Sequence, residues 1–292
     1  MGNELFRVTL LGTGGPPPRV DRFGPSTLVE AGEEKFIFDA GRGALQRLYQ
    51  LKIPFGDITG LFLTHLHSDH VVGFPDLWLT GWNGQKWGQR TVPLRVWGPP
   101  ETQEMMTHLQ QAYQFDIRIR THYPKEGVAI VAQEFTDGVV YDENGVRVIA
   151  FEVDHGRVKP AYGYRINYRG HSVVLSGDTR FNENVIQFAT GVDLLVHEVA
   201  LMTDEFMRTA KAASIIAGNH TTAEEAGKVF DRAKPKLAVY SHILEFGDPS
   251  LQDLIDGTRR AYGGPFEIGE DLMGIEIGED VVVRPPGELQ NG

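Results

Sequence analysis

Three histidines and one aspartate fall within six residues, in the stretch HLHSDH at residues 65–70, directly after the apolar run GLFLT. In an extended chain His65 and His67 project to the same side, whereas Asp69 and His70 follow once the chain has begun to turn. Imidazole nitrogen and carboxylate oxygen suit zinc, manganese and iron. This loop could therefore present two pairs of ligands to two adjacent ions.

Three further candidate ligands follow other apolar runs. His155 ends FEVDH, Asp178 follows LSG, and His242 lies within VYSHI. Any one of them alone is better explained by a capped turn or by a buried histidine with hydrogen-bond partners. Taken with HLHSDH, they indicate a site for two ions, which also needs an anionic oxygen between the ions to reduce their repulsion.

Two ions about 3.5–4 Å apart supply hydrolytic chemistry, because a water that bridges them loses a proton near neutral pH and becomes a nucleophile. This nucleophile could attack phosphorus, sulfur or a carbonyl carbon. Asp69 could orient the metal-bound hydroxide as well as bind a metal, so it is also a candidate catalytic residue. The ions themselves would stabilise the charge that develops on the ester oxygens.

The composition limits the class of protein. The 292 residues include no cysteine, so a disulfide, a thiolate metal site and a cysteine nucleophile are all excluded. The net charge of −11 disfavours a surface that holds nucleic acid. No run of about 18 apolar residues occurs, and the start lacks the features of a signal peptide. We expect a soluble, cytoplasmic protein without a membrane partner, or a periplasmic or secreted one if a leader has been removed.

Strand-like and helix-like stretches alternate along the chain. Runs rich in β-branched and aromatic residues predict strands at residues 6–12, 26–32, 35–41, 61–65, 94–99, 146–155, 193–199 and 236–243. Residues 161–179 predict a hairpin that turns at Arg169-Gly170. Helices are predicted at residues 44–51, 101–115 and 221–233, the last with a capping box of Thr222 and Glu225. This order predicts one layered α/β domain over residues 1–292.

The glycine-rich stretch LGTGGPPP at residues 11–18 follows a predicted strand and could suggest a loop that cradles phosphate. Such a loop must open a helix whose amides point at the phosphate. Three consecutive prolines disfavour that helix, so a sharp strand-to-loop turn is the preferred interpretation.

The HxHxDH motif, the FDAG at residues 38–41 and the three later ligands resemble the metallo-β-lactamase superfamily of binuclear metallohydrolases, over roughly residues 5–283. The resemblance implies an αββα sandwich with the site at the edge between the two sheets. It also implies two metal sites that share Asp178 as a bridging ligand. One site would be made by His65, His67 and His155 and the other by Asp69, His70 and His242. Zinc is favoured in both, with manganese or iron as alternatives.

The segments LLVHEVALM, GNHTTAEEAGKVF and LAVYSHI are similar, in that order, to the ribonuclease Z branch of the superfamily. Glu198 and His220 match the catalytic Glu–His pair of this branch, whereas Val199 departs from its usual alanine. We expect Glu198 to position His220 as the general acid that protonates the leaving group. The alternative for His220 is a helix-capping role, and His197 could be a structural partner of a ligand.

The interval between His155 and Asp178 is short. Members of this branch that process tRNA carry a long arm there, which grips the tRNA, whereas its arylsulfatase-like and phosphodiesterase-like members lack the arm. The opening of the chain and the DLWLTGW segment look closer to the arylsulfatase-like members. We therefore expect hydrolysis of a small phosphate or sulfate ester, such as a diester or an aryl ester, and nucleic acid is disfavoured as a partner.

Other functions remain open. A tRNA 3′-processing endonuclease would use the same metals and cleave precursor tRNA without the arm. A lactonase would also use these metals, although Glu198 and His220 point away from it. A non-catalytic metal-binding protein is the alternative outside enzymes, and the complete set of seven ligands argues against it. Because members of this branch are often dimers, the resemblance also implies a homodimer.

All four tryptophans, Trp78, Trp82, Trp87 and Trp97, fall in one window after the metal motif. A packed satellite core is one explanation, because tryptophan is often simply large and buried. The other is an aromatic rim over the site, in which the loop at residues 82–89 is mobile and Trp82 and Trp87 contact an apolar substrate group.

Overall fold

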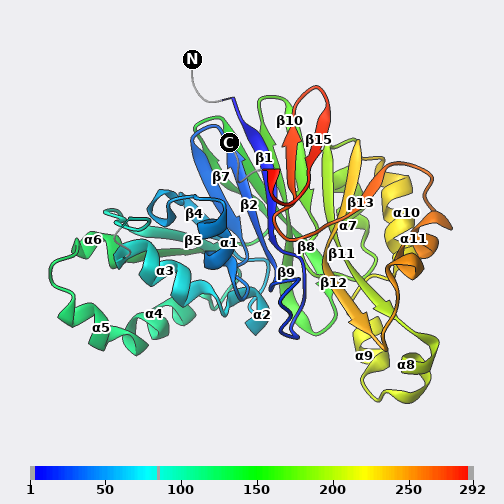
Figure 1. Ribbon diagram of the computed structural model, residues 1–292, viewed down its shortest axis with the longest axis horizontal. Coiled ribbons are helices and arrows are strands. Elements are labelled where there is room, and N and C mark those ends of the chain that lie inside the picture. The colour runs from blue at the N-terminus through cyan, green and yellow to red at the C-terminus, as the bar shows by residue number, and fades with distance from the viewer. Residues whose placement is uncertain (1–3, 84–85, 289–292) are drawn as a thin grey trace.

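Two β-sheets face each other across a shared core in the computed structural model, which describes residues 4–83 and 86–288 (Figure 1). The first sheet has the strand order β15-β14-β1-β2-β3-β4-β5-β6, and the second has the order β13-β12-β11-β10-β9-β8-β7. The strands of the first sheet are β1 (Phe6–Gly12), β2 (Ser26–Ala31), β3 (Glu34–Phe38), β4 (Gly60–Phe62), β5 (Leu94–Gly98), β6 (Ile130–Glu134), β14 (Gly274–Ile277) and β15 (Val281–Arg284). Those of the second are β7 (Gly138–Glu143), β8 (Val146–His155), β9 (Val158–Tyr168), β10 (His171–Leu175), β11 (Leu194–Met202), β12 (Leu237–Phe246) and β13 (Phe266–Ile268).

Helices cover the outer faces of both sheets. The first sheet packs against α1 (Ala44–Gln50), α3 (Phe74–Asn83) and α4 (Thr102–Ala112), and the second against α7 (Glu183–Ala189), α10 (Ala223–Ala233) and α11 (Leu251–Arg259). Figure 1 shows α3 and α4 on one side of the sheets and α10 and α11 on the other. The remaining helices are short: η1 (Phe55–Asp57), α2 (Ser68–Val71), α5 (Gln114–Ile119), α6 (Lys125–Val128), α8 (Asp204–Thr209) and α9 (Ala213–Ala217). The expected αββα layering is confirmed.

The strands place apolar side chains on both faces of each sheet, because each sheet has the other sheet on one face and helices on the other. Between the sheets, the ring of Phe62 stacks on Phe38 and on Trp97, and Tyr164 makes edge-type ring contacts with Phe38 and Phe62. All four are buried, and burying one such side chain contributes about 1.5–3 kcal/mol. Within residues 4–83 and 86–288, no helix is long and apolar enough to cross a membrane.

Local sequence signals explain several element ends. Arg169 and Gly170 both have positive φ, at 49° and 83°, as the two-residue turn predicted between β9 and β10 requires. Helix α10 begins after Thr222, and the predicted capping box with Glu225 is present. The helix predicted at residues 101–115 instead ends at Ala112, since Tyr113 leaves helical geometry before α5 begins.

The glycine-rich stretch leaves β1 as a loop and opens no helix, so the strand-to-loop interpretation is confirmed. The buried carboxylate of Asp271 fixes this loop. It accepts hydrogen bonds from the backbone N–H and hydroxyl of Thr13, at 2.9 and 2.8 Å, and from the N–H of Phe23, at 2.8 Å. Arg47 donates to the same carboxylate at 2.9 Å. One side chain near the C-terminus thereby anchors both ends of a loop near the N-terminus.

Replacing Asp271 by alanine should lower the free energy of unfolding by about 3–5 kcal/mol, because it removes a buried acceptor from the half-buried Arg47 guanidinium and from two backbone donors. Chemical denaturation measures this loss. As a control, Glu183→Ala removes a solvent-exposed ion pair with Arg232 and should leave the midpoint almost unchanged. Equal midpoints for the two variants would contradict the anchoring role of Asp271.

Candidate metal centre

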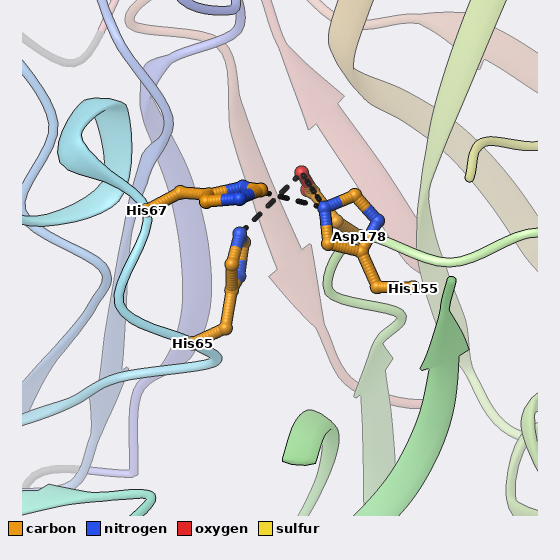
Figure 2. Close-up of side chains that lie close together, drawn as sticks. All are labelled: His65, His67, His155 and Asp178. Carbon is orange, nitrogen blue, oxygen red and sulfur yellow. Dashed lines mark hydrogen bonds and ion pairs between the residues drawn. The ribbon is translucent and has the colours of Figure 1, made fainter. Parts of the chain in front are cut away.

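The seven predicted ligands come together at one end of the two facing sheets. His65 and His67 lie in the loop after β4, and Asp69 and His70 lie on α2. The other three come from the second sheet: His155 is the last residue of β8, Asp178 follows β10, and His242 lies in β12. Figure 2 shows His65, His67, His155 and Asp178 pointing toward one another from these separate elements.

The carboxylate of Asp178 lies at the centre of the group. Its Oδ2 is 3.3 Å from Nε2 of His70 and 3.4 Å from Nε2 of His242. The same oxygen is 3.8 Å from Nε2 of His65 and 3.8 Å from Nε2 of His155. One carboxylate oxygen therefore lies within reach of two sets of histidines, as a bridging ligand would.

Among the described residues, potential ligand atoms form three overlapping compact sets that could each hold a metal ion. Within each set, the atoms lie within 4.8 Å of one another. The first set is His65, His67, His155 and Asp178, and the second is Asp69, His70 and His242. The third set is Asp178, His220 and His242. The first two sets hold the residues that the sequence assigned to the two sites, and their role as ligands stays a prediction.

Unusual backbone conformations aim these side chains. His242 has φ of 45°, which non-glycine residues rarely adopt, and it lies in a β-bulge where Ser241 and His242 together oppose Glu198 of β11. Gly177 also has positive φ, at 61°, and a side chain there would clash with the carbonyl of Tyr162. The bulge and the glycine turn bring Asp178 and His242 to the same point as Glu198.

Further polar groups orient the ligands. Asp39 accepts hydrogen bonds from the N–H and hydroxyl of Thr64, both at 2.8 Å, and its Oδ2 is 2.7 Å from Nδ1 of His70. The Thr64 hydroxyl is also 3.0 Å from Nδ1 of His65. Nδ1 of His155 donates to the carbonyl of Asn219 at 3.0 Å. Such contacts fix the tautomer and ring orientation of a metal-binding histidine.

These orienting residues carried only a weak sequence signal. Asp39 directly follows β3 in the FDAG segment and has φ of 58°, but its partner His70 lies 31 residues away. Thr64 precedes the histidine motif as an ordinary strand-end residue. Asn219 contributes its backbone carbonyl. Because every residue has a carbonyl, the residue type gives no sign of this contact.

The donor set fits divalent cations. Burial lowers the pKa of His65 well below its usual value, and the neighbouring His70 lowers it further, so His65 is neutral and can coordinate. Burial alone would raise the pKa of Asp178, but His242 and His70 hold this pKa well below its usual value. In the part of the chain that the structure describes, the Nε2 atoms of His65, His70 and His242 are buried without a hydrogen-bond partner. Each unsatisfied atom costs about 1–3 kcal/mol, and cations beside Asp178 would satisfy all three.

Glu198 and His220 form a pair beside this centre. Nδ1 of His220 is 3.3 Å from Oε2 of Glu198, whose Oε1 accepts the backbone N–H of Thr221 at 2.8 Å. A ring nitrogen of His220 lies within 4.8 Å of ligand atoms of Asp178 and His242. The helix cap belongs to Thr222, so the capping alternative for His220 does not hold.

The protonation of His220 follows from its neighbours. Burial lowers its pKa, but the charge of Glu198 and the hydrogen bond to it outweigh burial and raise the pKa to about 9. Bound cations would lower this pKa, because like charges repel. Glu198 therefore favours the protonated form of His220 against the effect of burial.

The tryptophans do not form the expected rim. Trp82 is 1% exposed and its indole donates to the carbonyl of Pro124 at 2.8 Å, so its expected contact with substrate is wrong. The ring of Trp87 packs edge-on against Tyr49. Among the described residues, no ring contact joins either tryptophan to a histidine of the centre. Trp78 and Trp82 are buried on α3 and Trp97 is buried between the sheets, so core packing explains these three tryptophans better. Residues 84–85 of the loop expected to be mobile lie outside the described residues.

Two facing sheets with histidine and aspartate sets at their edge define a protein of the metallo-β-lactamase class. The sequence model of the beta-lactamase superfamily domain matches residues 34–243. Ribonuclease Z from Mycolicibacterium gilvum (strain PYR-GCK) is 34% identical over 289 residues, which cover 97% of this chain and 100% of that protein. Ribonuclease Z from Mycobacterium avium (strain 104) is 36% identical over 281 residues, which cover 94% and 99%.

Solved structures share the fold. The crystal structure of human tRNase Z, short form, superimposes with a TM-score of 0.70 at 23% identity, over 93% of this chain and 99% of that one. The metallo-beta-lactamase fold protein YhfI from Bacillus subtilis gives a TM-score of 0.76 at 19% identity, over 94% of this chain and 100% of that one. The chain belongs to the β-lactamase superfamily and, within it, to the family of these Ribonuclease Z proteins.

The expectation that nucleic acid is disfavoured as a partner is wrong, because relatives that match this chain end to end carry the name Ribonuclease Z. The expectation rested on a net charge of −11 and on a short interval before Asp178. A net charge sums over the whole surface and does not report the charge at one site. Exposed Arg157 and Lys159 follow His155 directly, in the turn and the first residues of β9.

Replacing Asp39 by asparagine should weaken the affinity for divalent cations by about 10–100-fold, because His70 loses the carboxylate that orients it. Competition with a chromogenic chelator measures this affinity. Asp193→Asn is the matched control, since Asp193 is another buried carboxylate but pairs with Ser172 and Lys236. Equal affinities in the two variants would show that Asp39 does not support the centre.

Proposed function

We propose that this chain is a metal-dependent phosphodiesterase that cleaves RNA, with the 3′ end of precursor tRNA as its substrate. The Glu198–His220 pair beside the two ligand sets carries the chemical part of the proposal, because it supplies a general acid next to a hydrolytic centre. The names of the relatives, Ribonuclease Z and tRNase Z, support the choice of RNA.

In this proposal the centre holds two divalent cations, with zinc favoured over manganese and iron. One is held by His65, His67 and His155, the other by Asp69, His70 and His242, and Asp178 bridges the two. When bound, the cations would lower the pKa of a water molecule and neutralise charge on the phosphate. The chain's own contribution is to fix the ligands on strand ends and to keep Asp178 ionised.

His220 has the role of general acid. Its Nδ1 hydrogen-bonds to Glu198, which leaves Nε2 as the nitrogen that can hold a proton toward the leaving group. Glu198 is itself held by the N–H of Thr221, so its carboxylate cannot turn away without losing that bond. The proposal assigns Asp69 both to bind a cation and to orient the attacking water, and its Oδ2 lies 3.5 Å from Nε2 of His242.

A small phosphodiester is the second candidate substrate, and the short β8–β9 hairpin favours it. His155 pairs directly with Val158, so only Gly156 and Arg157 turn the chain between the two strands. The β9–β10 connection is equally tight, at Arg169 and Gly170. No additional chain is therefore available there to embrace a large RNA. No comparable observation favours a sulfate ester or a lactone.

The test is a reconstituted activity panel with precursor tRNA that carries a 3′ trailer, a bis-aryl phosphate, an aryl sulfate and a lactone. We expect RNA cleavage at one position, lost on chelation and lost in Asp178→Ala. Turnover of the bis-aryl phosphate with intact RNA would replace the proposal by the second candidate. Failure to cleave either phosphodiester would refute both.

Replacing His220 by alanine should slow cleavage of RNA by about 10²–10⁴-fold, because ribose oxygen is a poor leaving group that needs a proton. Hydrolysis of a bis-nitrophenyl phosphate should change much less, since nitrophenolate leaves as an anion. The exposed His108 provides the control variant, His108→Ala, which should match the unaltered chain on both substrates. Equal losses on both substrates would show that His220 acts on something other than the leaving group.

A further inference from the structure

Thr221 lies between the general acid His220 and helix α10, and it is completely buried, at 0% exposure. The next residue, Thr222, is the N-cap of α10. In the proposed function the backbone N–H of Thr221 holds Glu198. The hydroxyl of Thr221 has no part in that step, although its contact reaches another loop of the site.

This hydroxyl joins two loops that carry different parts of the site. It donates to the carbonyl of Thr179 at 2.6 Å, and Thr179 directly follows Asp178. Thr179 is also 0% exposed, so water does not compete for the bond. The two threonines are 42 residues apart in the sequence. One buried hydrogen bond therefore connects the chain next to His220 with the chain next to the central carboxylate.

Glu198 lies between the same two loops. Its Oε1 accepts the N–H of Thr221 at 2.8 Å and the N–H of Thr179 at 3.4 Å. The carbonyl of Thr221 accepts the N–H of Ala200 on β11 at 2.9 Å. Thr221 thus contacts Glu198 and Ala200 through its backbone and Thr179 through its side chain. A change of side chain can remove the contact with Thr179 and leave both backbone groups in place.

We propose that Thr221 is a positioning residue whose hydroxyl sets the spacing between the His220–Glu198 pair and the carboxylate of Asp178. The inference rests on the proposed function, in which His220 protonates the leaving group of a phosphate held beside Asp178. A proton donor must come within about 2.6–3.2 Å of the atom that receives the proton. Threonine suits the role, because its β-branched side chain has restricted χ1 and holds the hydroxyl in one direction.

Thr221→Val keeps the shape of the side chain and removes the hydroxyl. We expect it to lower kcat for RNA cleavage by about 10–100-fold, because a misplacement of about 1 Å between reacting groups has an effect of this size. KM should change by less than about twofold, since the contacts that bind the RNA are kept. Thr221→Ser keeps the hydroxyl and should restore kcat to within about threefold of the unaltered chain.

Thr102→Val is the matched control. Thr102 is also 0% exposed, and its hydroxyl donates to the carbonyl of Pro99 at 2.7 Å, but this bond closes the start of α4 and joins no part of the site. Its kcat should equal that of the unaltered chain. A kcat of Thr221→Val equal to that of Thr102→Val would overturn the proposal, as would failure of Thr221→Ser to restore activity.

The His220→Ala background separates positioning from a purely structural role. If the hydroxyl acts through His220, Thr221→Val should lower kcat by less than about twofold once His220 is alanine, because both changes remove the same contribution. A structural role predicts the same fold-loss in both backgrounds. Equal fold-losses would therefore overturn the proposal.

Two further readouts locate the effect. Hydrolysis of bis-nitrophenyl phosphate by Thr221→Val should fall by less than about threefold, because nitrophenolate leaves without a proton. Stepwise titration with cobalt(II), followed by its visible spectrum, should give the affinities of the unaltered chain. A tenfold or greater loss of cobalt affinity would overturn the proposal, because the hydroxyl would then act on the metal ligands.

The outcomes separate this inference from the proposed function. If the unaltered chain with bound cations leaves RNA intact, the choice of RNA as substrate is refuted. Thr221→Val and Thr102→Val are then compared on diphenyl phosphate, because phenolate is a poorer leaving group than nitrophenolate. A selective loss in Thr221→Val on diphenyl phosphate would support the positioning role, and equal rates for the two variants would refute it.

Discussion

The carboxylate of Asp178 is buried beside the Nε2 atoms of four histidines, and the rest of the site is arranged around this interaction. Its Oδ2 lies within 3.8 Å of four histidines from three different elements of the fold and a loop. Without cations, the facing Nε2 atoms of His65, His70 and His242 remain unsatisfied. The two sheets hold these groups together although burying them costs free energy. Binding of cations would recover that free energy.

The fold supplies that rigidity in two ways. The aromatic core of Phe38, Phe62 and Tyr164 fixes the two sheets against each other just beneath the ligands. After β3 and at the bulge within β12, the chain adopts strained conformations at Asp39 and His242, with φ of 58° and 45°. Such strain persists only where the surroundings impose it, and it is concentrated at functional sites. In this site the strained conformations turn His242, from the second sheet, and Asp39, which orients His70, toward one point.

The sequence predicted those features that depend on local pattern. Spacing within HLHSDH and the polar ends of apolar runs indicated which histidines and aspartates the fold brings together, and alternating elements indicated the layers. Features that depend on distant pairing were not predictable: Asp39 meets His70 only in the folded chain, and Asn219 contributes a carbonyl. The expectations of an aromatic rim, drawn from the tryptophan window, and of no nucleic-acid partner, drawn from the net charge, failed for a related reason. Composition does not tell which side of α3 faces the core, or how the charge is distributed around the site.

Anomalous diffraction from crystals of the zinc-loaded chain, recorded on both sides of the zinc absorption edge, tests the central claim most directly. The account predicts two peaks that flank the carboxylate of Asp178, one against His65, His67 and His155 and the other against Asp69, His70 and His242. A single peak, or peaks away from Asp178, would contradict a binuclear centre built on this carboxylate.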